Sequence, residues 1–369
     1  MKVPFLDLKR GYEELKTELE TKLLEIAQNQ RYILGPELNA FEKEIADYLG
    51  AKYAIGVASG TDALILSLKA LGIGPGDEVI TTDYSFFSSA GAIVWVGAKP
   101  VFVDIEPAGF NLDPGEIEKK ITERTKAILV VHLFGESAEM DEVIKIAKKH
   151  KLFIIEDACQ AMGAEYKGKK AGAIGDLGCY SFYPTKVLGG FGDGGLVVTD
   201  YPAFYQAVMD LRVHGATGYG DRKTLGINSR LDEIQAGLLR IKLKYLDQWI
   251  KKRREKADRY RELLGGLPLM LPEDKTYLKH SYNSFVVLAE KRDELAEFLK
   301  KKEIGFAIYY PRSFHQFSCF QQFISKNDYF PNAEKASRKC LALPIFPEIT
   351  DAEQETVAKV IREFYGENN

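Results

Sequence analysis

A single lysine, Lys186, lies in residues 181–195 (SFYPTKVLGGFGDGG), with aromatic residues before it and glycines after it. The chain has 50 Lys and Arg residues, and lysines usually lie among polar neighbours on the surface. Apolar surroundings lower the pKa of an ammonium group, because burial disfavours the charged form. The free amine is then a nucleophile toward carbonyl groups. The surroundings of Lys186 therefore indicate a catalytic amine.

A phosphate site is one interpretation of residues 58–64 (ASGTDAL), where a strand pattern ends and a helix pattern begins. Gly60 lets the backbone approach a bound group, Thr61 offers an N–H and a hydroxyl, and the helix start adds the positive end of its dipole. An ordinary helix cap by Ser59 or Thr61 explains the same residues equally well. The segment alone leaves both interpretations open.

An acidic pair, Glu156 and Asp157, ends the apolar run of residues 153–161 (FIIEDACQA). Proteins of the α/β class bind ligands at the carboxyl ends of their parallel strands. Asp157 is therefore a candidate partner for a cationic group, with Gln160 as a hydrogen-bonding neighbour. The alternative is that Asp157 only caps a turn.

These candidates match the needs of one cofactor, pyridoxal 5′-phosphate. It requires a Schiff-base lysine, an acid against its pyridine nitrogen and a phosphate site. Lys186, Asp157 and residues 58–64 are of the right types. The ring also needs a face to stack on, and Phe86 in residues 83–93 (DYSFFSSAGAI) offers one.

A glycine motif in residues 190–195 fits the pattern G-x-G-x-x-G but lacks its context. A dinucleotide-binding fingerprint needs a strand before it and a helix after it. Here the glycines precede LVVTD, which is a strand pattern. We therefore expect no nicotinamide cofactor, and we interpret the glycines as allowing a sharp turn or a close approach to a bound group.

The elements that position these residues alternate between short apolar runs and helical patterns. Strands are predicted at 54–59, 77–82, 99–105, 126–134, 152–158, 178–182 and 194–200. Helices are predicted at 62–70 and 140–150. This alternation indicates an α/β fold with a mainly parallel sheet covered by helices on both faces. The last two strands lack a helix between them, so part of the sheet is expected to be antiparallel.

The chain changes character after residue 200. Apolar residues recur at helical steps from Leu231, and the pattern continues through the basic residues 251–263 (KKRREKADRYREL). A helix of that length is expected to break or to link two domains. The tail has a strand pattern at 284–290 and a helix pattern at 292–302, which are typical of a smaller α+β domain. We predict a large cofactor domain at 1–250 and a small domain at 251–369.

Composition narrows the function classes. The net charge of −3 gives no general attraction to nucleic acids or anionic membranes. No apolar run is long enough to span a bilayer, and the start of the chain lacks the pattern of a signal peptide, so we expect a cytoplasmic protein. The four cysteines form no C-x-x-C pair, and no histidine has zinc-finger spacing, so we expect reduced thiols and no metal site.

The chain resembles the DegT/DnrJ/EryC1/StrS family of pyridoxal-phosphate nucleotide-sugar aminotransferases nearly end to end. The resemblance is carried by VPFLDLKR, RYILGPELNAFEKEIADYLG, GVASGTDAL, IIEDACQAMGAEYKGKKAG, SFYPTKVLGGFGDGGLVVTD, LRVHG, GINSRLDEIQAG and LALPIFPE. It implies fold type I of the pyridoxal-phosphate transferases, which is like that of aspartate aminotransferase. That fold has a large mixed-sheet cofactor domain and a small α+β C-terminal domain.

The resemblance also implies roles for individual residues. Lys186 would bind the cofactor aldehyde, Asp157 would face the pyridine nitrogen, Phe86 would stack on the ring and Gln160 would contact the 3′-oxygen. The phosphate would be held by Gly60, Thr61 and Ser181. Family members are homodimers with shared active sites, and Asn228 would reach the phosphate bound by the partner.

The implied substrates are L-glutamate and a dTDP-linked keto-sugar, for the synthesis of deoxyamino sugars such as those of lipopolysaccharide or S-layer glycans. The sequence SFYPTK followed by LGGFGDGG resembles enzymes that aminate C3 of 3-keto-6-deoxyhexoses, whereas members acting at C4 more often have histidine in place of Tyr183. The candidate substrate residues are Tyr183, His214, Arg230, Tyr310 and His315. Packing of Tyr183 against the cofactor alone, and a solvated loop around Tyr310, are the competing interpretations.

Three alternatives remain open at this point. They are a C4 nucleotide-sugar aminotransferase, an amino-cyclitol aminotransferase and a non-catalytic regulatory member of the family. The presence of Lys186, Asp157 and Phe86 argues against the regulatory alternative. Cys159, Met162, Val187 and Ser281 depart from the residues most common in the family, and these positions lie beside the chemistry.

Overall fold

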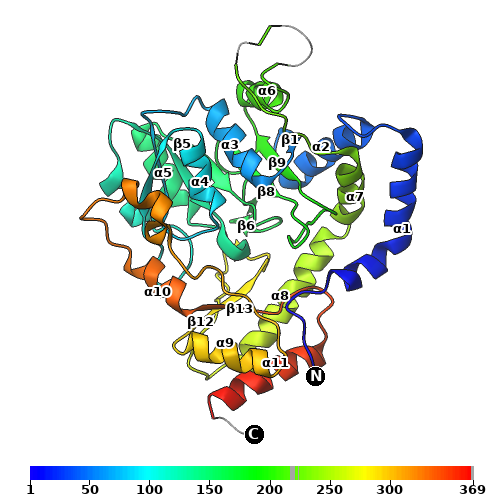
Figure 1. Ribbon diagram of the computed structural model, residues 1–369, viewed down its shortest axis with the longest axis vertical. Coiled ribbons are helices and arrows are strands. Elements are labelled where there is room, and N and C mark those ends of the chain that lie inside the picture. The colour runs from blue at the N-terminus through cyan, green and yellow to red at the C-terminus, as the bar shows by residue number, and fades with distance from the viewer. Residues whose placement is uncertain (217–220, 223, 367–369) are drawn as a thin grey trace.

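The computed structural model describes residues 1–216, 221–222 and 224–366 (Figure 1). Its main element is a seven-stranded sheet with the order β1-β9-β8-β5-β4-β2-β3. The strands are β1 (Tyr53–Val57), β2 (Glu78–Thr82), β3 (Lys99–Val103), β4 (Thr125–Val131), β5 (Phe153–Asp157), β8 (Leu177–Ser181) and β9 (Gly195–Thr199). All seven predicted strands are present. Only β9 pairs antiparallel with its neighbours, β8 and β1, so the expected antiparallel part of the sheet is confirmed.

Helices cover both faces of this sheet because its strands are apolar on both sides. Alternate residues of β4 illustrate the division: Leu129 joins one hydrophobic cluster and Val130 joins another. The surrounding helices are α2 (Pro36–Leu49), α3 (Gly60–Ala70), α4 (Ser88–Trp95), α5 (Met140–His150), α6 (Pro202–Leu211) and α7 (Glu233–Leu243). The predicted helices at 62–70 and 140–150 correspond to α3 and α5. This two-sided burial is what the parallel strands require.

The long helical pattern after Leu231 divides into α7 and α8 (Leu246–Leu264), with the break at Lys244 and Tyr245. The N-terminal helix α1 (Leu8–Asn29) packs against α7. In Figure 1, α8 runs from the large sheet toward the C-terminal part of the chain. The predicted boundary between residues 250 and 251 falls inside this continuous helix, so the division into two domains stays a prediction.

The C-terminal part has its own antiparallel sheet, β10 (Leu269–Met270), β12 (Phe285–Ala289) and β13 (Cys340–Leu343). Its helices are α9 (Arg292–Lys301), α10 (Pro331–Lys339) and α11 (Asp351–Phe364). The predicted strand at 284–290 and helix at 292–302 correspond to β12 and α9. Residues from this part also enter the core beside the large sheet, among them Phe314 and Phe320. The two parts therefore share core contacts.

The remaining elements are short. A third sheet contains β6 (Glu165–Tyr166), β7 (Lys169–Lys170) and β11 (Leu278–Lys279). Short 3₁₀ helices are η1 (Pro114–Glu116), η2 (Glu118–Lys120), η3 (Leu133–Gly135), η4 (Phe314–Gln316) and η5 (Ser318–Phe323). Among the described residues, none of the helices has the length and apolar character needed to cross a membrane.

Candidate active site

A cavity of about 830 Å³ lies at the carboxyl ends of β1, β5 and β8, and we call it the active-site cavity. Its lining includes most of the residues predicted to bind the cofactor or substrate. They are Gly60, Thr61, Phe86, Asp157, Gln160, Ser181, Tyr183, Lys186 and Tyr310. Residues far apart in the sequence therefore meet where parallel strands end, which is the usual ligand position in such sheets.

Lys186 follows β8 in a turn, and its own backbone N–H donates to the carbonyl oxygen of Tyr183 at 2.9 Å. The side chain is half-buried and lines the cavity. Burial lowers the pKa of the Lys186 amine, while the nearby Cys159 thiol and Asp157 carboxylate oppose part of that change. The amine is thus easier to deprotonate than that of a surface lysine, which suits a nucleophile or a base.

Asp157 ends β5 and is 5% exposed. One carboxylate oxygen accepts the Ser89 hydroxyl at 2.7 Å, and the other accepts the backbone N–H of Cys159 at 3.2 Å. The carboxylate therefore caps a turn, as the alternative interpretation held, and it also lines the active-site cavity. These two contacts hold its orientation, so it can face a cationic ring nitrogen in the cavity.

The start of α3 forms one wall of the cavity. Ser59 is the helix cap, because its hydroxyl accepts the N–H of Asp62 at 3.0 Å. Thr61 instead exchanges a hydrogen bond with the Ser88 hydroxyl at 2.7 Å. A side chain at Gly60 would begin 2.7 Å from the Cys159 sulfur and 2.8 Å from Ser181 Cβ. The helix start thus presents a backbone that only glycine permits, and its dipole suits a phosphate.

Gln160 has a fixed orientation between two neighbours. Its amide oxygen accepts the backbone N–H of Phe134 at 3.1 Å, and its amide nitrogen donates to the Tyr310 hydroxyl at 2.8 Å. Phe86 is 53% exposed and lies 6.1 Å from the ring of Tyr310. A large aromatic face left open at a cavity is free to stack on a planar ring. Tyr310 is half-buried, accepts the Gln160 hydrogen bond and lines the cavity, which favours an ordered position over a solvated loop.

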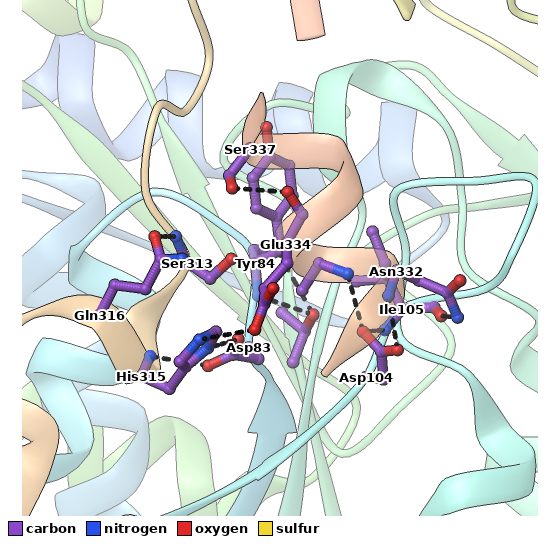
Figure 2. A network of polar contacts seen from close by, with 12 residues as sticks. Asp83, Tyr84, Asp104, Ile105, Ser313, His315, Gln316, Asn332, Glu334 and Ser337 are labelled. Carbon is purple, nitrogen blue, oxygen red and sulfur yellow. Dashed lines mark hydrogen bonds and ion pairs between the residues drawn. The ribbon is translucent and has the colours of Figure 1, made fainter. Parts of the chain in front are cut away.

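His315 is not among the described residues that line the active-site cavity, and its predicted contact with substrate stays a prediction. Figure 2 shows it beside Asp83. Its ring Nδ1 contacts a carboxylate oxygen of Asp83 at 2.5 Å, and its backbone N–H donates to the other at 2.8 Å. Asp83 is completely buried, and a buried carboxylate needs a cationic or hydrogen-bonding partner. Burial raises the pKa of Asp83 to about 6, and the Asp83 carboxylate raises the pKa of His315.

His214, Asn228 and Arg230 are also absent from the described lining of the cavity. His214 and Asn228 are exposed. Asn228 forms an isolated antiparallel bridge with Val213, the residue before His214. The Arg230 Nε atom is buried and has no hydrogen-bond partner among the described residues. The roles expected for these three residues stay predictions.

Arg253 and Asn283 also line the cavity, and the sequence analysis did not identify them. Arg253 lies inside the basic run 251–263, where its neighbours are mostly exposed charges. The sequence nevertheless contained an indication that Arg253 is buried. Its position falls in the apolar stripe of α8, four residues after Trp249 and four before Ala257, and a charge at such a position is usually buried for a reason.

The residues fit pyridoxal 5′-phosphate on structural grounds. Gly60 brings the start of α3 to the cavity at a position where no side chain fits, Asp157 offers a fixed carboxylate, and Phe86 offers an open ring face. Lys186 offers an amine of lowered pKa in the same cavity. Together with the mainly parallel sheet, these residues define a pyridoxal-phosphate enzyme of fold type I.

The chain belongs to the DegT/DnrJ/EryC1/StrS aminotransferase family, whose model matches residues 13–362. It is 45% identical to a pleiotropic regulatory protein of Geobacillus stearothermophilus over 99% of each chain. It is 42% identical to the dTDP-3-amino-3,4,6-trideoxy-α-D-glucose transaminase of Streptomyces venezuelae, covering 98% and 96%. It is 41% identical to a UDP-N-acetyl-3-dehydro-α-D-glucosamine 3-aminotransferase of Acidithiobacillus ferrooxidans, covering 98% and 97%.

Solved structures agree with this assignment. DesV of S. venezuelae, crystallised in complex with a ketimine intermediate, has a TM-score of 0.96 at 41% identity over 100% of both chains. NtdA of Bacillus subtilis, crystallised with the bound cofactor PMP, has a TM-score of 0.91 at 33% identity, covering 98% of this chain and 85% of that one. The predicted family, fold type, aminotransferase class and pyridoxal-phosphate cofactor are confirmed.

Proposed function

We propose that this aminotransferase moves an amino group from L-glutamate to C3 of a dTDP-linked 3-keto-6-deoxyhexose. The observation that carries the proposal is the meeting of Lys186, Asp157 and Gly60 around one cavity. The choice of C3 and dTDP is supported by the similarity to the S. venezuelae transaminase, whose name specifies a dTDP-3-amino sugar.

When bound, pyridoxal phosphate supplies an electron sink for the carbanion formed at the amino-bearing carbon. Lys186 Nζ is the base that takes the proton from the α-carbon of glutamate, and its lowered pKa suits that task. In the second half of the reaction, the same amine delivers a proton to the sugar carbon that receives nitrogen. One lysine therefore serves both substrates, which must occupy the cavity in turn.

Asp157 would stabilise positive charge on the ring nitrogen through a carboxylate that Ser89 and the Cys159 N–H keep in place. The N-terminus of α3 would hold the phosphate, and Gln160, which donates to the Tyr310 hydroxyl, lines the same cavity. Tyr183 is 52% exposed at this cavity, close to Lys186 in sequence. We assign it to sugar contact, and its competing role is packing against the cofactor alone.

A homodimer with shared active sites forms part of the proposal. Asn228 and His214 are exposed and lie outside the cavity of their own chain. Phe86, Phe87 and Tyr183 are 53%, 46% and 52% exposed, and exposed aromatic groups of this kind favour an interface. Mixing the inactive variants Lys186→Ala and Asn228→Ala tests this. Shared sites predict recovered activity in mixed dimers, whereas independent sites predict none.

Two other functions have specific support. The A. ferrooxidans relative is named for a UDP-linked sugar, and the G. stearothermophilus relative is named as a regulatory protein. Turnover of glutamate with dTDP-3-keto, UDP-3-keto, dTDP-4-keto and amino-cyclitol acceptors distinguishes these possibilities. The proposal predicts the highest kcat/KM with the dTDP-3-keto sugar. Binding of a sugar nucleotide without any turnover would favour the regulatory function.

A further inference from the structure

Arg253 is a buried cation that lines the same cavity as the proposed catalytic lysine. It lies on α8, is 4% exposed and lines the active-site cavity. It also lines a second cavity of about 460 Å³, to which residues of the N-terminal segment and Glu348 contribute. Lys186 lines both cavities as well. The arginine therefore borders the cavity in which both substrates must react.

Only part of the Arg253 guanidinium is occupied by the protein. Nη1 donates to the backbone carbonyl oxygens of Tyr282 and Ile345, each at 3.0 Å. Nε is buried without a hydrogen-bond partner in the described part of the chain. A guanidinium carries five N–H donors, so the two carbonyls anchor one corner of the group and leave other donors unused.

The charge of Arg253 is also not neutralised. No carboxylate oxygen of the described residues forms an ion pair with it within 4.0 Å, whereas its neighbour Arg254 pairs with Asp274 at 3.2 Å. Burial lowers the pKa of Arg253 to about 10, and the more distant Glu348 opposes that change. The group thus keeps its charge at neutral pH. A buried charge without a partner is strongly destabilising, so a bound anion would relieve that cost.

A second unsatisfied group lines the same cavity. The Asn283 Oδ1 atom is buried without a hydrogen-bond partner among the described residues. Asn283 follows Tyr282, whose carbonyl oxygen helps to anchor Arg253. A buried acceptor without a hydrogen bond and a buried cation without an ion pair indicate that a ligand completes this side of the cavity.

We propose that Arg253 is the oxyanion anchor of the active site, binding an anionic group of the substrates. The inference rests on the proposed function, in which glutamate carries carboxylates and the sugar nucleotide carries a diphosphate. Arginine binds either group through charge-assisted, often bidentate hydrogen bonds. Because donor and acceptor use the same lysine in turn, a fixed cation on the wall of the same cavity would hold an anionic substrate there.

The test uses the holoenzyme and two probes, 2-oxoglutarate and dTDP, with binding measured by titration calorimetry. Arg253→Met is expected to weaken one of them by about ten-fold or more. Weaker binding of 2-oxoglutarate assigns the anchor to the donor carboxylate, and weaker binding of dTDP assigns it to the diphosphate. The control is Arg254→Met, which removes a neighbouring arginine already paired with Asp274. It is expected to leave both affinities unchanged.

Arg253→Lys guards against a purely structural role, because it keeps the charge but not the fork of donors. It is expected to raise KM for the affected substrate more than it lowers kcat. Affinities for both probes within two-fold of wild type, in a folded Arg253→Met or Arg253→Lys protein, would overturn the proposal. So would a wild-type protein that binds neither probe. Failure of the proposed function is separate, since it would appear as absent turnover in the wild type.

Discussion

Two groups of residues border the active-site cavity, and the protein holds them in different ways. Gly60, Asp157 and Lys186 lie at or just after the ends of β1, β5 and β8. The residues that contact Gly60 and Asp157 belong to the same part of the chain as the large sheet, among them Ser89, Cys159 and Ser181. Tyr310 comes from the C-terminal part of the chain and depends on contacts across more than 200 residues. The chemistry thus lies on the sheet, and one wall of the cavity is brought to it.

Residues 83 and 84, directly after β2, provide most of this long-range anchoring. The Tyr84 hydroxyl accepts the N–H of Tyr310 at 2.6 Å and donates to the carbonyl oxygen of Tyr309 at 2.7 Å. Asp83 holds the other end of the segment through His315. Figure 2 shows the contact of Asp83 with His315 beside Asp104, whose carboxylate accepts the N–H groups of Asn332 and Ala333 at the start of α10. A substitution at Tyr84 or Asp83 should therefore move the wall that bears Tyr310 without changing the residues on the large sheet.

The largest expected effect is the loss of turnover in Asp157→Asn, at the carboxyl end of β5. The amide can still accept from Ser89 but cannot stabilise positive charge in the cavity, so kcat is expected to fall about 100-fold or more. Steady-state turnover at saturating glutamate measures it. Asp200→Asn is the control, since Asp200 only accepts the Lys52 N–H at an exposed site. Equal kcat for the two variants would contradict the role of Asp157.

Gly60→Ala tests the proposed phosphate site at the start of α3. The new Cβ would lie 2.7 Å from the Cys159 sulfur and 2.8 Å from Ser181 Cβ, and such overpacking costs about 1–3 kcal/mol. We expect a lower affinity for pyridoxal phosphate, measured by titrating the apoenzyme. Gly74→Ala is the matched control, because its Cβ would meet nothing closer than 3.6 Å. A Gly60→Ala protein with unchanged cofactor affinity would speak against the phosphate site.

Tyr84→Phe tests the C-terminal wall. Loss of the buried hydroxyl leaves the Tyr310 N–H without its partner, at a cost of about 1–3 kcal/mol. Tyr180→Phe removes a different buried hydrogen bond, to the carbonyl oxygen of Ala171, and should destabilise the fold without moving this wall. We therefore expect KM for the sugar to rise in Tyr84→Phe and not in Tyr180→Phe. A rise of similar size in both would reduce the role of Tyr84 to general stability.

The smallest expected effect is the change with pH in the stability that His315 contributes to the fold. The pKa of His315 is raised in the folded protein by Asp83, with Glu334 and Asp104 adding to the negative surroundings. A raised histidine pKa stabilises the fold fully below the unfolded value near 6.5 and loses that contribution as pH rises through the folded value. The advantage of wild type over His315→Gln in urea unfolding is expected to shrink by about 1 kcal/mol or less between pH 6 and pH 8.5. An advantage that grows with pH would contradict this.

The same contrast explains what could be predicted from the sequence. The seven strands could be predicted because each is a short apolar run. The start of α3 could be predicted because residues 58–64 combine a helix cap and a glycine. The pairing of His315 with Asp83 could not be predicted, because the two residues lie 232 positions apart and no local pattern shows it. Arg253 was missed because its burial depends on tertiary packing, which a basic run conceals.

The most direct test of the account is the absorbance spectrum of the purified protein with pyridoxal phosphate, recorded before and after L-glutamate. The account predicts a band from cofactor bound to Lys186, a shift of that band on adding glutamate, and loss of both in Lys186→Ala. A wild-type protein that binds no pyridoxal phosphate, or a Lys186→Ala protein with the same spectrum and turnover, would contradict the assignment of Lys186 and of the cavity around it.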